Sequence, residues 1–169
     1  MSFKGISMLI TARKVVQIHR VIRRELGLPS IIIPSGVVQI LEWSIAQVED
    51  LQNRPEAYPC IFAEGAQLFY FLTSIRPFRS YNQVTGLCVV DWWLRRQGFC
   101  LTTLVDDDLQ AVIERVTYDY REPILYACDR FSQEFRYWFF MHSQPTSGQP
   151  EGAIRVIKAM SRNLKAIDW

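Results

Sequence analysis

Apolar residues recur along most of this chain with the three-to-four-residue spacing of amphipathic α-helices. The first such segment predicts a helix over residues 11–26, with Thr11 as its N-cap and Gly27 in the left-handed conformation that often follows a helix. One face of this helix is apolar and another is basic. The apolar face consists of Val15, Ile18, Ile22 and Leu26, and the basic face of Arg13, Arg20 and Arg24. A second helix is predicted over residues 36–51, after a linker interrupted by prolines.

Two further segments, residues 61–74 and 83–96, are apolar on every side, which indicates helices surrounded by protein. The short loop between them predicts a buried helical hairpin with a structured tip. Beyond it we expect a brief extended segment over 99–104, helices over 106–118, 122–141 and 153–167, and a flexible loop over 143–152. The pattern therefore predicts an all-α protein, a helical bundle around a buried central helical hairpin.

Length and composition favour one compact domain over residues 1–169, because a chain of this size with 49% hydrophobic residues can bury most of its apolar surface. The net charge of +2 makes nucleic acid an unlikely partner, since binding to a phosphate backbone needs a clustered excess of Lys and Arg. No apolar run approaches the roughly 20 residues that span a membrane, and no membrane association is expected. The N-terminus lacks a signal-peptide pattern, so we expect a cytoplasmic protein.

The four cysteines contain no C-x-x-C pair and lie mostly in apolar surroundings. They are Cys60, Cys88, Cys100 and Cys128. We expect reduced, buried thiols and no metal site, because only His19 and His142 could supplement the sulfur ligands. His19 is expected to be a packed or capping histidine, and His142 lies near the C-terminus of a predicted helix, where positive charge is favourable.

The loop between the two buried helices carries the most informative motif. Its residues are Arg76, Pro77, Phe78, Arg79, Ser80, Tyr81, Asn82, Gln83 and Val84. This stretch resembles the signature loop of the Fic/Doc family (filamentation-induced-by-cAMP and death-on-curing proteins), which reads His-Pro-Phe-x-Asp/Glu-Gly-Asn-Gly/Lys-Arg. Similar stretches flank it, namely Ile18-His19, residues 66–72 and residues 93–98. The resemblance covers residues 9–116 and implies a Fic/Doc-like fold, with 117–169 as additional C-terminal helices.

The resemblance implies a nucleotide site from which the reactive groups are missing. In the family, the histidine acts as a base toward a hydroxyl on a target protein, the acidic residue binds magnesium and the arginine clamps phosphate. Arg76 stands at the histidine position, and its guanidinium stays protonated near neutral pH. Ser80 stands at the carboxylate position and is a much poorer magnesium ligand. Tyr81 stands at the glycine position, where its ring is expected to crowd the anion pocket.

The remaining positions of the loop suggest structural roles. Gln83 and Val84 replace the small or basic residue and the arginine of the family motif. Pro77 and Phe78 are retained, and Phe78 is expected to be a core anchor. Asn82 is also retained, and its side chain is expected to cap the following helix. We therefore predict no catalytic residue and no metal ligand, and residues 76–84 are predicted to be a vestigial nucleotide- or anion-binding loop.

These observations favour a pseudoenzyme that acts by binding an unidentified protein and needs no cofactor. Arg76, Arg79 and Tyr81 would suit an acidic or phosphorylated partner. The alternative is a nucleotide-binding protein or a divergent transferase that places an AMP or phosphoryl group on a protein hydroxyl, which would require ATP and magnesium. A relation to toxin–antitoxin systems is implied only by the family.

Three other segments offer competing interpretations. A basic stripe on the last predicted helix favours either a solvated face or, as a second alternative function, an RNA-associated domain. The stripe consists of Arg155, Lys158, Arg162 and Lys165. The aromatic run 135–140 indicates core, with a homodimer or partner surface as the alternative. Residues 147–152 fit the family's autoinhibitory pattern Ser/Thr-x-x-x-Glu-Gly/Asn, but Gly148 and Pro150 favour a flexible loop.

Overall fold

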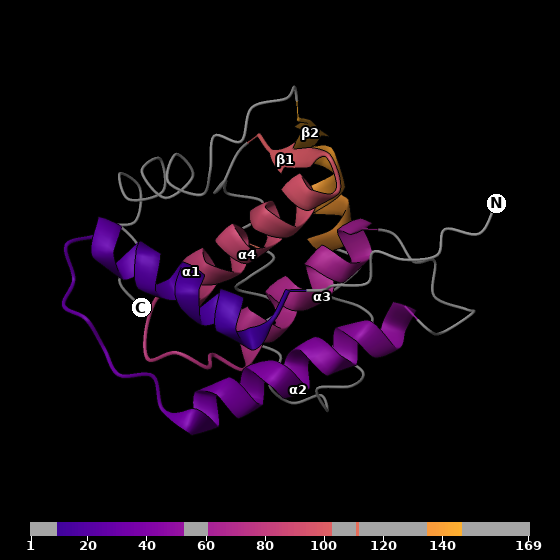
Figure 1. The fold of residues 1–169 in the computed structure, drawn as a ribbon. Helices are drawn as coiled ribbons and strands as arrows, with labels where there is room; N and C mark the ends of the chain where they lie inside the picture. The colour runs from indigo at the N-terminus through magenta and orange to yellow at the C-terminus, as the bar shows by residue number, and fades with distance from the viewer. Residues whose placement is uncertain (1–9, 53–60, 103–110, 112–134, 147–169) are drawn as a thin grey trace.

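The computed structural model describes residues 10–52, 61–102, 111 and 135–146, and these residues are mostly helical (Figure 1). The helices are α1 (Ala12–Glu25), α2 (Ser35–Gln52), α3 (Ile61–Ser74) and α4 (Asn82–Arg96), and residues 135–141 form a further helical segment. This content agrees with the predicted all-α class. Each of the first four predicted helices begins and ends within one residue of its observed bounds. The helices predicted over 106–118 and 153–167, and most of the one over 122–141, lie outside the described residues.

Local sequence explains where α1 begins and ends. The side chain of Thr11 accepts a hydrogen bond from the backbone N–H of Lys14 at 3.2 Å, which satisfies one of the free donors of the first turn. After the helix, Gly27 takes the left-handed conformation with φ 69°, as expected. The predicted division of the helix is also confirmed. Val15, Ile18 and Ile22 are buried, whereas Arg13, Arg20 and Arg24 are exposed.

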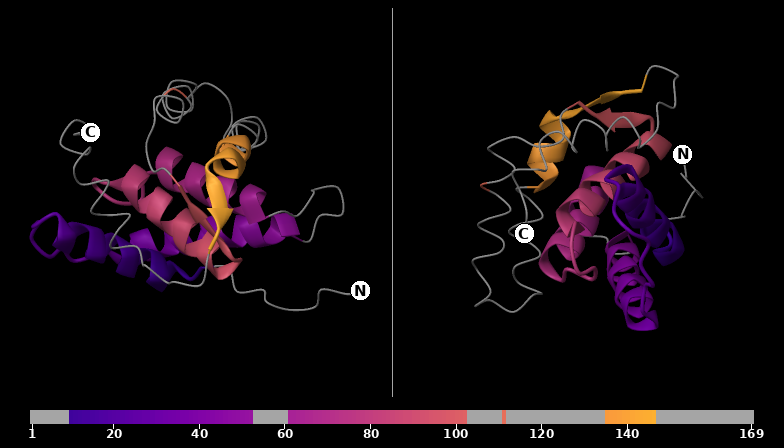
Figure 2. Two further views of the ribbon diagram at one scale, coloured as in Figure 1. Left: turned by 90° about the horizontal axis from the view of Figure 1, so that it is seen from above. Right: turned by 90° about the vertical axis from the view of Figure 1, so that its left-hand side faces the viewer.

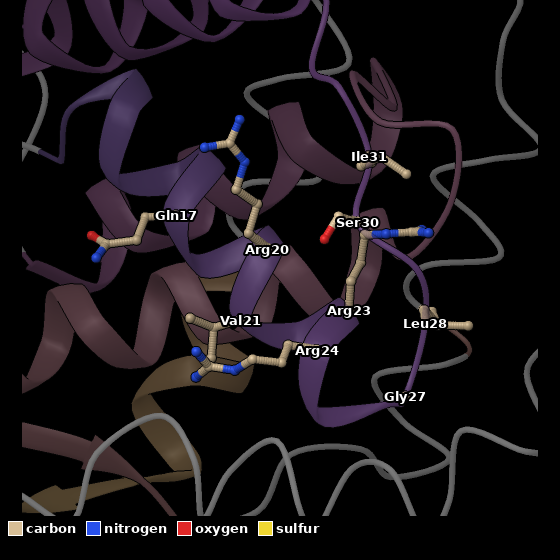
Figure 3. Close-up of a pocket in the computed structure, with 9 residues that line it drawn as sticks. All are labelled: Gln17, Arg20, Val21, Arg23, Arg24, Gly27, Leu28, Ser30 and Ile31. Carbon is tan, nitrogen blue, oxygen red and sulfur yellow. The ribbon is translucent and has the colours of Figure 1, made fainter.

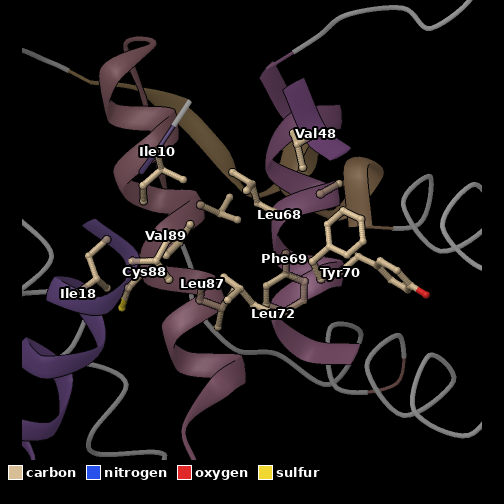
Figure 4. Packing of buried hydrophobic residues seen from close by; sticks show 14 of the residues in the cluster. Ile10, Ile18, Val48, Leu68, Phe69, Tyr70, Leu72, Leu87, Cys88 and Val89 are labelled. Carbon is tan, nitrogen blue, oxygen red and sulfur yellow. The ribbon is translucent and has the colours of Figure 1, made fainter. Parts of the chain in front are cut away.

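α3 and α4 form the predicted hairpin at the centre of the molecule (Figures 1 and 2). Every residue from 65 to 73 in α3 and from 84 to 91 in α4 is buried. Leu87 of α4 faces Phe69 and Leu72 of α3 between the two helices (Figure 4). Gly86 permits this close approach, because a Cβ atom at that position would lie 2.9 Å from the ring of Phe69. The hairpin is therefore a tightly packed stem that fixes the two ends of its loop.

The other helices cover this stem. α1 packs on α4 and α2, and α2 in turn packs on α3. The helical segment 135–141 contributes Phe135 and Phe139, whose rings meet that of Phe69 edge to face at centroid distances of 4.8 and 5.4 Å. The expectation that the aromatic run is core is confirmed for these two residues and Trp138, whereas Tyr137 and Phe140 are exposed.

A short antiparallel ribbon lies on the opposite side of the molecule from α2 (Figures 1 and 2). β1 (Phe99–Leu101) pairs with β2 (Ser143–Pro145), with Cys100 opposite Gln144. The extended segment is thus confirmed over 99–101, but the prediction of a flexible loop from 143 is wrong for residues 143–145. Their polar composition favours a loop, and only pairing with β1 makes them a strand. Among the described helices, none is long and apolar enough to cross a membrane.

Candidate functional site

The loop of residues 75–81 is fixed first by Phe78. The Phe78 side chain is 4% exposed, and its ring stacks on the imidazole of His19 in α1, with centroids 3.8 Å apart and planes 4° from parallel. α1 itself packs on α4, so this stack joins the middle of the loop to the core of the bundle. The predictions that Phe78 is a core anchor and that His19 is a packed histidine are both confirmed.

Asn82 fixes the loop a second time, by a contact that differs from the expected one. Its Oδ1 accepts a hydrogen bond from the backbone N–H of Phe78 at 2.9 Å, and its Nδ2 donates to the carbonyl of Phe78 at 2.8 Å. The prediction that Asn82 caps the following helix is wrong. Tyr81 is the N-cap and makes no side-chain capping bond, while Asn82 is the first residue of α4. An amide side chain offers both a donor and an acceptor, so it can satisfy both backbone groups of one buried residue.

Two residues of the loop adopt backbone conformations that favour glycine. Tyr81 has φ 60° and ψ 28°, and Arg76 has φ 52°. For non-glycine residues such conformations cost about 1–2 kcal/mol each. The carbonyl of Tyr81 is held in place by the N–H of Thr85 at 2.9 Å and by the hydroxyl of Thr85 at 2.7 Å. The Tyr81 ring is half-buried against the core.

Thr85 also determines the protonation of His19. Its hydroxyl proton is donated to the carbonyl of Tyr81, so Thr85 Oγ1 must accept from His19 Nδ1, 2.9 Å away. This contact selects the tautomer protonated at Nδ1. The other nitrogen, Nε2, is buried without a hydrogen-bond partner among the described residues. Burial, and to a lesser extent the positive charge of Arg23, lower the pKa of His19 to about 4, so the ring is neutral at pH 7.

The predicted site residues therefore divide into an inward and an outward set. The inward set consists of Phe78, Asn82 and Val84, which are buried. The outward set contains Arg76 and Arg79, which are exposed, together with the partly exposed Pro77, Ser80, Tyr81 and Gln83. The expectation that Tyr81 crowds an anion pocket stays a prediction.

The outward set can bind an acidic or phosphorylated group through its guanidinium groups, but it contains no general base and no carboxylate. In the part of the chain that the structure describes, no group of three or more His, Cys, Asp or Glu residues could hold a metal ion. The segment 147–152 and the basic stripe of residues 155–165 lie outside the described residues.

Two polar residues that stabilise this region were missed in the sequence. Thr85 has no sequence feature that sets it apart. Asp91 could have been recognised, because it is an acidic residue within an apolar helical pattern and has Arg95 one turn later. Asp91 is buried, forms an ion pair with Arg95 at 2.6 Å and accepts a hydrogen bond from the N–H of Leu101 at 2.9 Å. It thereby ties the end of α4 to β1.

The prediction of buried thiols is confirmed for Cys88 but not for Cys100. Cys88 is buried and Cys100 is partly buried, and both are free thiols. Burial, with a smaller contribution from Asp91, raises the pKa of the Cys88 thiol, which keeps it protonated and unreactive. Cys60 and Cys128 lie outside the described residues.

No protein-family model, curated protein or solved structure matches this chain. The loop motif therefore remains the basis for proposing a function.

Proposed function

We propose that this chain is a Fic/Doc-like domain that has lost nucleotidyl or phosphoryl transfer and acts in the cytoplasm by binding another protein. One observation carries this proposal: the motif residues that are retained are those that shape the loop, and those that are replaced are the ones that would carry the chemistry. Phe78 is retained and anchors the loop on His19. Asn82 is retained and binds both backbone groups of Phe78.

The backbone of Tyr81 gives independent support for the resemblance. Its φ of 60° places it in the left-handed region, where glycine has no steric penalty. The family motif has glycine at this position. The left-handed backbone at Tyr81 therefore supports a loop derived from a motif with glycine at this position.

The replaced positions support the loss of catalysis. Arg76 is exposed at the position of the family's histidine, and a guanidinium remains protonated at neutral pH and cannot accept a proton from a hydroxyl. Ser80 stands where the family has a magnesium-binding carboxylate. Because phosphoryl and nucleotidyl transfer depend on positioning and charge neutralisation, losing both groups removes most of the rate enhancement.

The same replacements suit recognition of a partner. Arg76 and Arg79 are exposed on a loop whose backbone is fixed from inside, so their side chains can pair with carboxylate or phosphate groups without ordering the loop first. Tyr81, on the same loop and partly exposed, adds an aromatic residue, a type that often dominates binding energy. We place the partner contact on these three residues.

Isothermal calorimetry with ATP, GTP, UTP and CTP, with and without magnesium, tests the loss of catalysis. We expect no heat of binding, and no transfer of radiolabel from ATP labelled at the α- or γ-phosphate to proteins of a lysate. Binding that Arg76→Ala abolishes would instead favour the alternative, a nucleotide-binding protein or altered transferase.

Affinity capture tests the position of the partner contact. The captured proteins are compared between the wild type, Arg76→Ala and Tyr81→Ala. Arg13→Ala is the matched control, because Arg13 is equally charged and exposed but lies on α1. We expect the partner to be lost with the two loop variants and kept with the control. Equal capture by all four proteins would show that the loop is not the contact surface.

A further inference from the structure

An open pocket of about 770 Å³ lies between α1 and the segment 27–31 (Figure 3). Arg20, Arg23 and Arg24 line it, and none of the described residues that line it is acidic. Apolar side chains of Val21, Leu28 and Ile31 lie between and beside these charges. The pocket therefore combines positive charge with apolar surface, and none of its described lining residues belongs to the loop of residues 75–81.

The wall of this pocket is fixed by contacts within the chain. Arg23 donates two hydrogen bonds to the carbonyl of Pro29, from Nη2 at 3.0 Å and from Nε at 3.3 Å. The N–H of Leu28 donates to the carbonyl of Arg23 at 2.9 Å, directly after the left-handed turn at Gly27. These bonds hold the segment against α1, so a ligand would not have to order it on binding.

The other two arginines keep most of their capacity to bind an anion. Arg20 is exposed and forms no ion pair with any described residue. Among the described residues, Arg24 pairs with Glu25 alone, at 3.6 Å, and an exposed pair at this distance contributes little. The guanidinium groups of Arg20, Arg23 and Arg24 point in different directions in Figure 3, so they do not converge on a single small anion. Charges that are spread along a helix fit negative groups spread along a chain.

We propose that this pocket binds an acidic peptide segment of a partner protein, with carboxylates paired to Arg20 and Arg24 and apolar side chains placed on Val21, Leu28 and Ile31. A nucleic acid fits less well, because none of the described lining residues is aromatic and could stack on bases. This site does not depend on the proposed role of the loop.

Fluorescence anisotropy of a short fluorescein-labelled peptide of alternating glutamate and leucine, titrated with the full chain, tests the proposal. We expect saturable binding that weakens as salt is added. The double variant Arg20→Gln/Arg24→Gln should bind roughly tenfold more weakly, because each exposed ion pair contributes about 0.2–1 kcal/mol. Arg13→Gln removes a charge from the same helix outside the pocket and should change the affinity by less than about twofold. Circular dichroism checks that each variant is folded.

Several outcomes would overturn the proposal. The peptide could fail to bind, Arg13→Gln could weaken binding as much as Arg20→Gln/Arg24→Gln does, or a single-stranded oligonucleotide of equal charge could bind more tightly. Amide chemical shifts give a separate test. Added peptide should shift residues 17–31, and Arg76→Ala should leave its affinity unchanged. Shifts centred on residues 75–84 would assign peptide binding to the loop instead.

Discussion

The inward and outward sides of the α3–α4 loop are held in different ways. Inward, Phe78 stacks on His19, and both hydrogen-bonding groups of the Phe78 backbone are bound by Asn82. Outward, Arg76 and Arg79 are exposed, and Arg76 has a backbone conformation, φ 52°, that is unfavourable for a non-glycine residue. The shape of the loop thus comes from packing within the chain, whereas the side chains of Arg76 and Arg79 take no part in that packing. Variants on the two sides should therefore have different effects on stability.

Replacing Phe78 should have the largest effect. Phe78→Ala removes a buried ring from its stack on His19 and leaves a cavity, so we expect a loss of about 3–5 kcal/mol in the free energy of unfolding. Arg79→Ala, one position further along, removes an exposed side chain and should change stability by less than about 0.5 kcal/mol. Urea denaturation followed by circular dichroism compares the two variants. Similar values for both would show that Phe78 is not the anchor of the loop.

Lowering the pH should reduce the free energy of unfolding through His19, which lies on the inward side of the loop. Burial lowers the pKa of His19 to about 4, whereas in the unfolded chain it is near 6.5. The unfolded state therefore binds more protons between these values, and stability falls as the pH drops through this window. The contribution of His19 is fully present above about pH 6.5 and decreases by about 3 kcal/mol by pH 4.

The acid effect is measured as the free energy of unfolding in urea at several pH values. His19→Gln should flatten the dependence between pH 6.5 and 4, because the substituted side chain does not titrate. His142→Gln is the control, since it removes the other histidine of the chain. Curves that run parallel for the wild type and His19→Gln would mean that His19 has no depressed pKa.

Removing the amide of Asn82 should have an intermediate effect. Asn82→Ala leaves the buried N–H and carbonyl of Phe78 without their partners, and we expect a loss of about 2 kcal/mol. Gln83→Ala is a suitable control, because Gln83 is the next residue of α4 and is only partly buried. It should change stability by less than about 0.5 kcal/mol in the same denaturation experiment. If Asn82→Ala lowers the free energy of unfolding as little as Gln83→Ala does, the two hydrogen bonds of Asn82 do not hold the loop.

Local patterns in the sequence were sufficient to predict the described helices and the buried hairpin. The cap at Thr11 and the left-handed turn at Gly27 depend on a few neighbouring residues, so both could be predicted. The strand at residues 143–145 could not, because its partner lies more than forty positions away at residues 99–101. Its own sequence, Ser-Gln-Pro, resembles that of a loop.

The candidate site was predictable to a similar extent. Its position in the chain followed from the apolar pattern of the two flanking helices, and the burial of Phe78 followed from its retention in the motif. The bond between His19 and Thr85 joins residues 66 positions apart, and it depends on how α1 packs against α4. Asn82 had two possible sets of backbone partners. Its side chain could bind either the first turn of the following helix or the backbone of Phe78. The choice depends on the conformation of the loop backbone, which tertiary packing determines.

The smallest effect is expected on the outward side, at Arg76. Its φ of 52° is unfavourable for arginine and free of strain for glycine, but glycine also gains freedom in the unfolded chain. Arg76→Gly should therefore raise the free energy of unfolding by at most about 1 kcal/mol. Arg79→Gly, whose position has no positive φ, should lower it slightly. The opposite result would be that Arg76→Gly destabilises the protein as much as Arg79→Gly does. In that case the Arg76 side chain itself stabilises the loop, and stability would not depend on the inward side alone.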